Sequence, residues 1–304
     1  MESKRPGLGV GLLLLGVLAT LWGASYSFIK VGVETIPPVT LIAARTLIAG
    51  TLLLGVLAVR GQRLPTRSGL WWRFLVQACL NSVVPFTLIA WAELTVDAGL
   101  ATILNSTSPI FAFLLTAAVT RHEPATGRKL LGVVAGMAGV CLIVGVEALH
   151  GLGEASAAQL AIVAATVCYA GAAVFGRGFA GVDPMLPAAG SMLCGAAILV
   201  PASLVVDRPW TLAPSTVSLL ALLALSAFST ALAFVIYFRL VQTLGSVATT
   251  AQAYLRVPVG VVIGVLFLGE TPTAVAWIGL ICVVTGAAAM TLPRSAARRT
   301  SAAS

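Results

Sequence analysis

The chain has 304 residues, of which 59% are hydrophobic and only 9% are charged, and its mean hydropathy is +1.03. Soluble domains carry about 25% charged residues, so this composition excludes a water-soluble globule and predicts an integral membrane protein. The net charge of +8 does not indicate nucleic-acid binding, because the basic residues cluster in connecting loops rather than on one face.

Ten apolar segments are long enough to cross a membrane as helices, since a hydrocarbon core of ~30 Å requires roughly 20 helical residues. Strands of a membrane barrel would instead alternate over about ten residues. The first segment follows basic residues as a signal peptide does, but its apolar run continues to about Ile29, which is long enough to span. The predicted spans are 8–29, 38–59, 71–92, 98–119, 129–147, 157–178, 184–206, 215–238, 246–268 and 273–292.

Basic residues fall in alternate loops, which predicts the orientation of the chain. With the N-terminus in the cytoplasm, most of the 18 lysine and arginine residues face the cytoplasm, whereas the opposite loops are mainly acidic. We therefore expect a multi-pass protein of the inner (cytoplasmic) membrane with both termini in the cytoplasm. The inward-facing residues are Lys4, Arg5, Arg60, Arg63, Arg67, Arg73, Arg121, Arg128, Lys129, Arg177, Arg239, Arg294, Arg298 and Arg299.

The two halves of the sequence resemble each other at a fixed offset of 147 residues. Each half, 1–150 and 151–304, contains five predicted spans, so the second half must cross the membrane in the opposite direction. Inverted repeats suit alternating access to a central site, although a duplication that only built a stable bundle would leave the same pattern. Matched pairs include Trp22 with Tyr169, Lys30 with Arg177, Pro37 with Pro184, Glu123 with Glu270, Gly132 with Gly279, and Gly139 with Gly286.

Four stretches carry a family pattern: "LWGASYSFIK" in the first span, "PPVTLIAARTLIAG" in the second, "LATILNSTSPIFAFLLTAAVTRHEP" in the fourth and "SVATTAQAYLRVPVGVVIGVLFLGETPT" in the ninth. With these motifs the chain resembles the EamA unit of the drug/metabolite transporter superfamily, and within it exporters of amino acids and metabolites of the YddG type. The first half departs from the pattern, with "RHE" where "GE" is typical. The resemblance covers the whole chain and implies an all-α membrane fold of ten helices in two inverted five-helix repeats.

Arg256 lies about ten residues into the ninth span, roughly 15 Å deep, which is too far for its side chain to reach the membrane surface. Gln252 and Thr249 share its helix face, and Pro258 removes a backbone hydrogen bond nearby. We expect Arg256, Gln252 and Thr249 to line the substrate pathway, with Pro258 as a kink. The alternative is a structural cation held by backbone carbonyls.

The fourth and third spans carry similar polar positions near mid-depth. Asn105 and Ser106 precede Pro109, and Asn81 precedes Pro85 by four residues. Kinked backbone at the membrane midplane is typical of transporter binding sites, so Asn105, Ser106 and Asn81 are predicted pathway residues and the two prolines predicted kinks. Hydrogen bonding between helices is the alternative.

Three further side chains are candidates. Trp22 and Tyr169 occupy matched positions too deep for an aromatic belt, which predicts that they line a central cavity, or else that they pack. Arg45 lies about eight residues after Pro37, so its guanidinium could reach the outer headgroups. The family resemblance implies a structural or gating function for Arg45.

Tight helix packing is predicted at Gly132 and Gly136 and at Gly260 and Gly264, where small residues recur every four positions. The five cysteines lie in apolar segments at spacings that fit no zinc or redox motif, so we expect no metal and no cofactor.

The buried charges favour an anionic group on the substrate. No predicted span has Asp or Glu at mid-depth, which argues against proton-coupled export of cationic drugs, whereas a central arginine suits a carboxylate or phosphate. We expect export of amino acids or related small carboxylates by alternating access. Other metabolites, drugs and organic phosphates are the alternative substrates.

Other classes of function fit less well. An intramembrane enzyme needs a nucleophile with a base, or metal ligands, at depth, but His122 and His150 lie in loops on opposite sides. A receptor gains nothing from inverted symmetry. We therefore expect a transporter rather than an enzyme, with a small-molecule substrate and membrane lipid as partners, no nucleic acid, and either a monomer or a homodimer.

Overall fold

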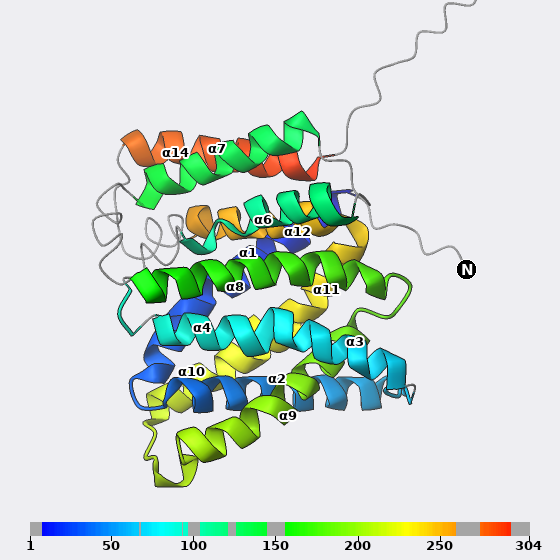
Figure 1. The fold of residues 1–304 in the computed structure, drawn as a ribbon, viewed down its shortest axis with the longest axis vertical. Coiled ribbons are helices and arrows are strands. Elements are labelled where there is room, and N and C mark those ends of the chain that lie inside the picture. The colour runs from blue at the N-terminus through cyan, green and yellow to red at the C-terminus, as the bar shows by residue number, and fades with distance from the viewer. Residues whose placement is uncertain are drawn as a thin grey trace, which may run out of the picture.

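The computed structural model describes residues 8–66, 68–92, 94–96, 104–120, 126–144, 156–259 and 274–292, and the regular structure within these ranges is helical. The helices are stacked along the long axis of the molecule, from α14 and α7 at one end to α2 and α9 at the other (Figure 1). They are α1 (Leu8–Val33), α2 (Pro38–Val59), α3 (Ser68–Ala78), α4 (Val84–Ala92), α6 (Ser108–Leu115), α7 (Gly127–Val144), α8 (Ser156–Gly176), α9 (Met185–Val206), α10 (Thr216–Ser226), α11 (Ala233–Thr243), α12 (Ser246–Thr250) and α14 (Ala274–Thr291), and residues 252–259 are also helical.

Five helical stretches in the described part of the chain are long and apolar enough to cross a membrane: Pro38–Val59, Ser68–Ala92, Ser156–Phe179, Met185–Val206 and Thr216–Thr243. Shorter apolar helices cover Gly9–Ser25, Ser108–Ala118 and Trp277–Thr291. Large apolar side chains point outward from these helices, as lipid contact requires; Val205 is 78% exposed and Leu131 71%. Parts of the predicted spans 98–119, 129–147 and 246–268 lie outside the described residues, as do His122, Glu123, His150, Gly260, Gly264 and Glu270.

The 147-residue offset reappears in the helix bounds, because α2 corresponds to α9 and α7 corresponds to α14 residue for residue. The α2–α9 pair is antiparallel. At the start of α2, the backbone N–H and the hydroxyl of Thr40 donate to Asp207 Oδ2, just after the end of α9, at 2.7 and 2.9 Å. At the other end, Gln62 Nε2 donates to Asp183 Oδ2 at 3.1 Å. Matching helices of the two halves therefore run in opposite directions.

The α7–α14 pair is joined through glycines. A Cβ on Gly132 would lie 2.7 Å from the carbonyl oxygen of Gly286, and one on Gly139 would lie 2.6 Å from that of Gly279. The close approach predicted at Gly132 is confirmed. From one contact to the next, the residue number rises in α7 and falls in α14, so this pair is antiparallel too. The close approach predicted at Gly136 is confirmed too, because a Cβ on Gly286 would lie 2.6 Å from the Gly136 nitrogen. Gly136 also makes room for the ring of Tyr254, whose hydroxyl donates to the carbonyl of Val133 at 3.0 Å.

The described residues include three π-helical segments; one is Thr116–Thr120, and the other two are bulges at nearly matched positions of the two halves. The first, Cys79–Val83, separates α3 from α4, and the second, Ala227–Leu232, separates α10 from α11. Pro85 follows the first bulge and lacks the N–H that a regular helix would need there. The second bulge contains no proline, so proline is not the common cause. Such bulges displace backbone groups from the regular ladder and often mark functional positions.

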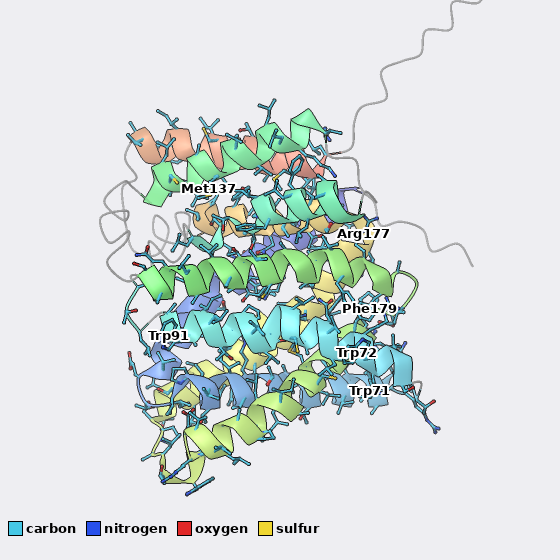
Figure 2. The ribbon with its side chains drawn as sticks, in the orientation of Figure 1. Trp71, Trp72, Trp91, Met137, Arg177 and Phe179 are labelled. Carbon is cyan, nitrogen blue, oxygen red and sulfur yellow. The ribbon has the colours of Figure 1, made fainter. Side chains whose placement is uncertain are left out.

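An aromatic cluster fills the bundle at the end where α3, α11 and the turn after α8 meet. Phe74, Phe179 and Phe238 are fully buried, with ring centroids 5.7 Å (Phe74–Phe179) and 5.9 Å (Phe179–Phe238) apart. The guanidinium of Arg73 lies 4.8 Å from the ring centroid of Phe179, and Arg73 donates to the carbonyl of Gly178. Figure 2 shows Phe179 at the end of the bundle opposite Trp91. We call Phe74, Phe179, Phe238 and Arg73 the aromatic plug.

Candidate functional site

A cavity of about 60 Å³ lies inside the bundle. Small-molecule pockets typically measure roughly 300–1,000 Å³, so the cavity is narrower here than a metabolite site, and a substrate would require its walls to move apart. Both halves of the chain contribute to its wall, through α1, α2, α4, α6 and the first bulge on one side and α8, α11, α12 and residues 252–259 on the other. The residues predicted from sequence that line it are Arg256, Gln252, Thr249, Trp22, Tyr169, Asn81 and Arg45.

Asn105 and Ser106 are buried, at 5% and 2% exposure, but they are not among the lining residues; Ser108 is. The chain turns at Ser106 and Thr107, and α6 begins at Ser108 with Pro109 in its first turn. Proline fits there because a first-turn N–H has no helical partner. The unwound turn predicted near Pro109 therefore lies before the proline, and it is held by the Thr107 hydroxyl, 3.1 Å from that of Thr166 in the other half.

The ninth predicted span is interrupted as well. A turn at Ala251 separates α12 from the helix at residues 252–259, so Thr249 lies on one side of the break and Arg256 on the other. Pro258 lies in the last described turn of that helix, seven residues after the break. The Thr249 hydroxyl donates to the carbonyl of Gly245 at 2.7 Å. Both interrupted segments place polar side chains at the cavity.

Arg256 is half-buried in the cavity wall and makes two contacts with predicted pathway residues. Its Nε donates to Gln252 Oε1 at 2.9 Å, one helical turn earlier. Its guanidinium carbon lies 5.4 Å from the ring centroid of Trp22, within the range of a cation–π interaction. An amide and an aromatic face thus hold the cation at the cavity.

Arg45 does not reach the outer headgroups, as its position in α2 had suggested. It is 2% exposed and is the largest fully buried side chain among the described residues. Its Nε donates to Thr230 Oγ1 at 2.7 Å, Nη2 donates to the Ser229 carbonyl at 3.5 Å, and its guanidinium carbon lies 3.8 Å from the ring centroid of Phe86. The second π-helical bulge supplies both oxygens, so the fold draws the guanidinium inward.

Trp22 connects the two arginines. Its indole Nε1 donates to the same Ser229 carbonyl at 3.1 Å, while its ring lies beside Arg256. The ring also packs against Phe234 and Tyr237, at centroid distances of 5.6 and 5.5 Å. Tyr169, the repeat partner of Trp22, lies across the cavity wall with its ring centroid 6.4 Å from that of Phe86. The cavity wall therefore has an aromatic ring beside each of its two arginines.

Asn81 provides a donor at the first bulge. Its Oδ1 accepts from the Ser82 hydroxyl at 2.7 Å, its residue is 2% exposed, and its Nδ2 has no hydrogen-bond partner within the described ranges. Buried polar groups are nearly always satisfied, so such a donor beside a cavity indicates a site for a ligand or water.

Sequence reasoning missed several lining residues: Ser25, Ile29, Phe86, Ile89, Phe234, Tyr237 and Thr250. Apolar residues in a membrane span carry no signal that separates cavity-facing from lipid-facing positions. Ser25, one turn after Trp22, could have been found from its shared helix face. Among the residues that the structure places, no group of three or more His, Cys, Asp or Glu side chains could hold a metal ion.

The chain is similar to known membrane transporters. The model of the EamA-like transporter family matches residues 9–145 and again 156–292. The chain is 28% identical over 280 residues to the uncharacterized inner membrane transporter YedA of Escherichia coli (strain K12), covering 91% of this chain and 89% of that protein. It is 26% identical over 260 residues to a probable terminal-alkyne amino-acid exporter of Streptantibioticus cattleyicolor, covering 85% of each. A solved crystal structure shares the fold, with a TM-score of 0.75 and 20% identity over 93% of this chain and 97% of that one.

Proposed function

Because the chain belongs to the EamA-like transporter family, and is a multi-pass membrane transporter, we propose that it exports amino acids or related small carboxylates across the cytoplasmic membrane by alternating access. The observation that carries this proposal is the central cavity, to which both halves contribute, with the Arg256 guanidinium in its wall. Arginine pairs with a carboxylate through parallel charge-assisted hydrogen bonds, and so fixes both the charge and the orientation of a substrate.

The proposed architecture is ten membrane helices in two inverted repeats, with both termini in the cytoplasm. The antiparallel pairing of α2 with α9 and of α7 with α14 supports it, because these helices occupy matched positions in the two family matches. The concentration of basic residues in alternate loops supports the orientation. Halves related in this way can exchange conformations and so expose one site to each side in turn.

The aromatic plug supports a gated pathway. Its contacts join α3 of the first half to the turn after α8 and to α11 of the second half. In the proposed orientation this end of the bundle faces the cytoplasm, since Arg73 and Arg177 lie there. Substrate that enters from the cytoplasm must therefore separate these rings before it reaches the cavity.

The substrate class is supported by the cavity wall and by one relative. The wall offers Arg256 for a carboxylate and aromatic rings for an apolar portion. The similar protein of Streptantibioticus cattleyicolor is named a probable amino-acid exporter, which favours amino acids for this chain as well. Organic phosphates remain the second candidate, because a guanidinium also binds phosphate.

The test is flux of labelled amino acids and small carboxylates into proteoliposomes that contain the purified full chain. Arg256→Ala should abolish flux while the folded protein remains in the membrane, whereas Arg60→Ala, in the loop after α2, should transport normally. Normal flux through Arg256→Ala would refute the site. Binding without flux in the unmodified protein would indicate a receptor instead.

A further inference from the structure

Two guanidinium groups line the cavity, and they belong to different halves of the chain: Arg45 to the first family match and Arg256 to the second. We propose that the cavity selects substrates with two carboxylate groups, one for each guanidinium, over molecules of the same size that carry one. This inference rests on the proposed function, because it names the substrate class of the same cavity.

Each guanidinium occupies an aromatic face of the cavity. Arg45 lies 3.8 Å from the ring centroid of Phe86, and Arg256 lies 5.4 Å from that of Trp22. An aromatic face is where an uncharged wall attracts a substrate ammonium. Here the guanidinium groups of Arg45 and Arg256 already cover these two faces. Each position therefore attracts an anion rather than a substrate ammonium.

The amide side chains of the cavity wall are also oriented as donors. Gln252 Oε1 accepts from Arg256 Nε at 2.9 Å, and Asn81 Oδ1 accepts from Ser82 Oγ at 2.7 Å. With their oxygens bound to protein donors, both amides have only NH₂ groups left to offer. Asn81 Nδ2 is buried and has no partner within the part of the chain that the structure describes. Carboxylate oxygens accept hydrogen bonds and donate none, so they complement this wall.

The hydroxyls of the wall accommodate an ammonium without selecting for it. Ser25 donates to the Trp22 carbonyl at 2.7 Å, and Thr250 donates to the Val247 carbonyl at 2.8 Å. Because their protons are used, these hydroxyls offer lone pairs to a substrate. The wall therefore also offers acceptors to the ammonium of an amino acid, and a second carboxylate is the group that the second guanidinium would recognise.

A dicarboxylate that contacts both guanidinium groups links the two halves. Alternating access requires the loaded protein to favour the closed intermediate, and a ligand shifts such an equilibrium only through contacts that differ between the states. A substrate that bridges Arg45 and Arg256 gains both contacts when the halves close on it. A monocarboxylate on Arg256 gains one.

The experiment compares matched pairs that differ by one charge: glutamate with glutamine, and succinate with succinamate. Uptake into proteoliposomes of the full chain should show at least a tenfold lower half-saturation concentration for the acid of each pair. Equal values within each pair would overturn the inference and leave the proposed function standing. Flux of no member of either pair, nor of any monocarboxylate, would overturn both.

Inorganic phosphate separates a dicarboxylate site from a general oxyanion site. Succinate should inhibit glutamate uptake at least tenfold more strongly than phosphate does at the same concentration. Inhibition by phosphate as strong as that by succinate would overturn the assignment to dicarboxylates.

Variants locate the selectivity. Arg45→Gln should raise the half-saturation concentration for glutamate at least tenfold more than it raises that for glutamine. Arg128→Gln is the matched control, because Arg128 also donates to a backbone carbonyl of the other half, that of Leu292, but does not line the cavity.

Where Arg45→Gln fails to fold, Asn81→Asp tests the same point. It keeps the size of the side chain and an acceptor for Ser82, and it adds a negative charge to the wall. Glutamate uptake should fall at least tenfold more than glutamine uptake. An unchanged ratio of the two would contradict the inference.

Discussion

Gly139 and Gly279 face each other so closely that a methyl group on Gly139 would lie 2.6 Å from the carbonyl oxygen of Gly279. The same contact recurs between Gly132 and Gly286, which are their equivalents at the 147-residue offset. Exchanging each glycine for its equivalent in the other half converts one pair into the other. A two-fold axis between the halves produces this relationship. Helices in lipid associate through close packing, so this crossing ties one half to the other.

Replacing Gly139 by alanine should destabilise the protein by about 1–3 kcal/mol, because the methyl group forces two backbones apart. Thermal unfolding in detergent measures the change. Gly55→Ala is the control: Gly55 lies in α2, where an added methyl group would meet no described side chain within 4 Å, so the melting temperature of this variant should stay close to that of the unmodified chain. Equal melting temperatures for the two variants would show that the crossing tolerates a methyl group.

The helical architecture and the repeat were predictable from the sequence. Apolar runs of roughly 20 residues predict helices in lipid. The offset that matches Gly132 with Gly279 also matches the bounds of α7 and α14. The one-turn spacing of Gln252 and Arg256 likewise predicted a shared face, and the two side chains are hydrogen-bonded. These features depend on composition and local periodicity, both of which a sequence records directly.

The environment of Arg45 was not predictable in the same way. Its depth along α2 can be counted, but its partners are Ser229 and Thr230, which a bulge in another helix turns inward. A π-helical bulge arises from tertiary packing as well as from local sequence, and here only one of the two is followed by proline. Phe86 and Tyr237 were missed for a related reason, since lipid and cavity walls both accept aromatic side chains.

Trp22→Phe should lower flux about two- to thirteenfold while the protein remains folded. The phenyl ring keeps an aromatic face for Arg256 but loses the indole N–H that donates to the Ser229 carbonyl at 3.1 Å. A hydrogen bond of this kind contributes about 0.5–1.5 kcal/mol, which corresponds to that range of rates. Proteoliposome uptake measures it, with Trp210→Phe as control because Trp210 is 68% exposed. Unchanged flux would mean that the indole N–H does not position the site.

Phe179→Ala should destabilise the protein by about 3–5 kcal/mol, because it removes a fully buried ring from the aromatic plug. Phe228→Ala serves as the control, since Phe228 is 56% exposed in the second bulge and should cost far less. Denaturation in mixed detergent micelles measures both variants. Similar losses would show that the plug is loosely packed and would weaken its assignment as a gate.

Labelling from each side of the membrane tests the proposed orientation. Thr66 follows Arg60 and Arg63, and Ser215 precedes α10; five predicted spans separate the two positions, so they should lie on opposite faces. In a variant whose native cysteines are all replaced by alanine, Ser215→Cys should react with an impermeant maleimide on intact spheroplasts. Thr66→Cys should react only after the membrane is opened, because basic loops stay in the cytoplasm. Reaction of both positions from one side would contradict the ten-span arrangement, and the reverse pattern would place the termini outside.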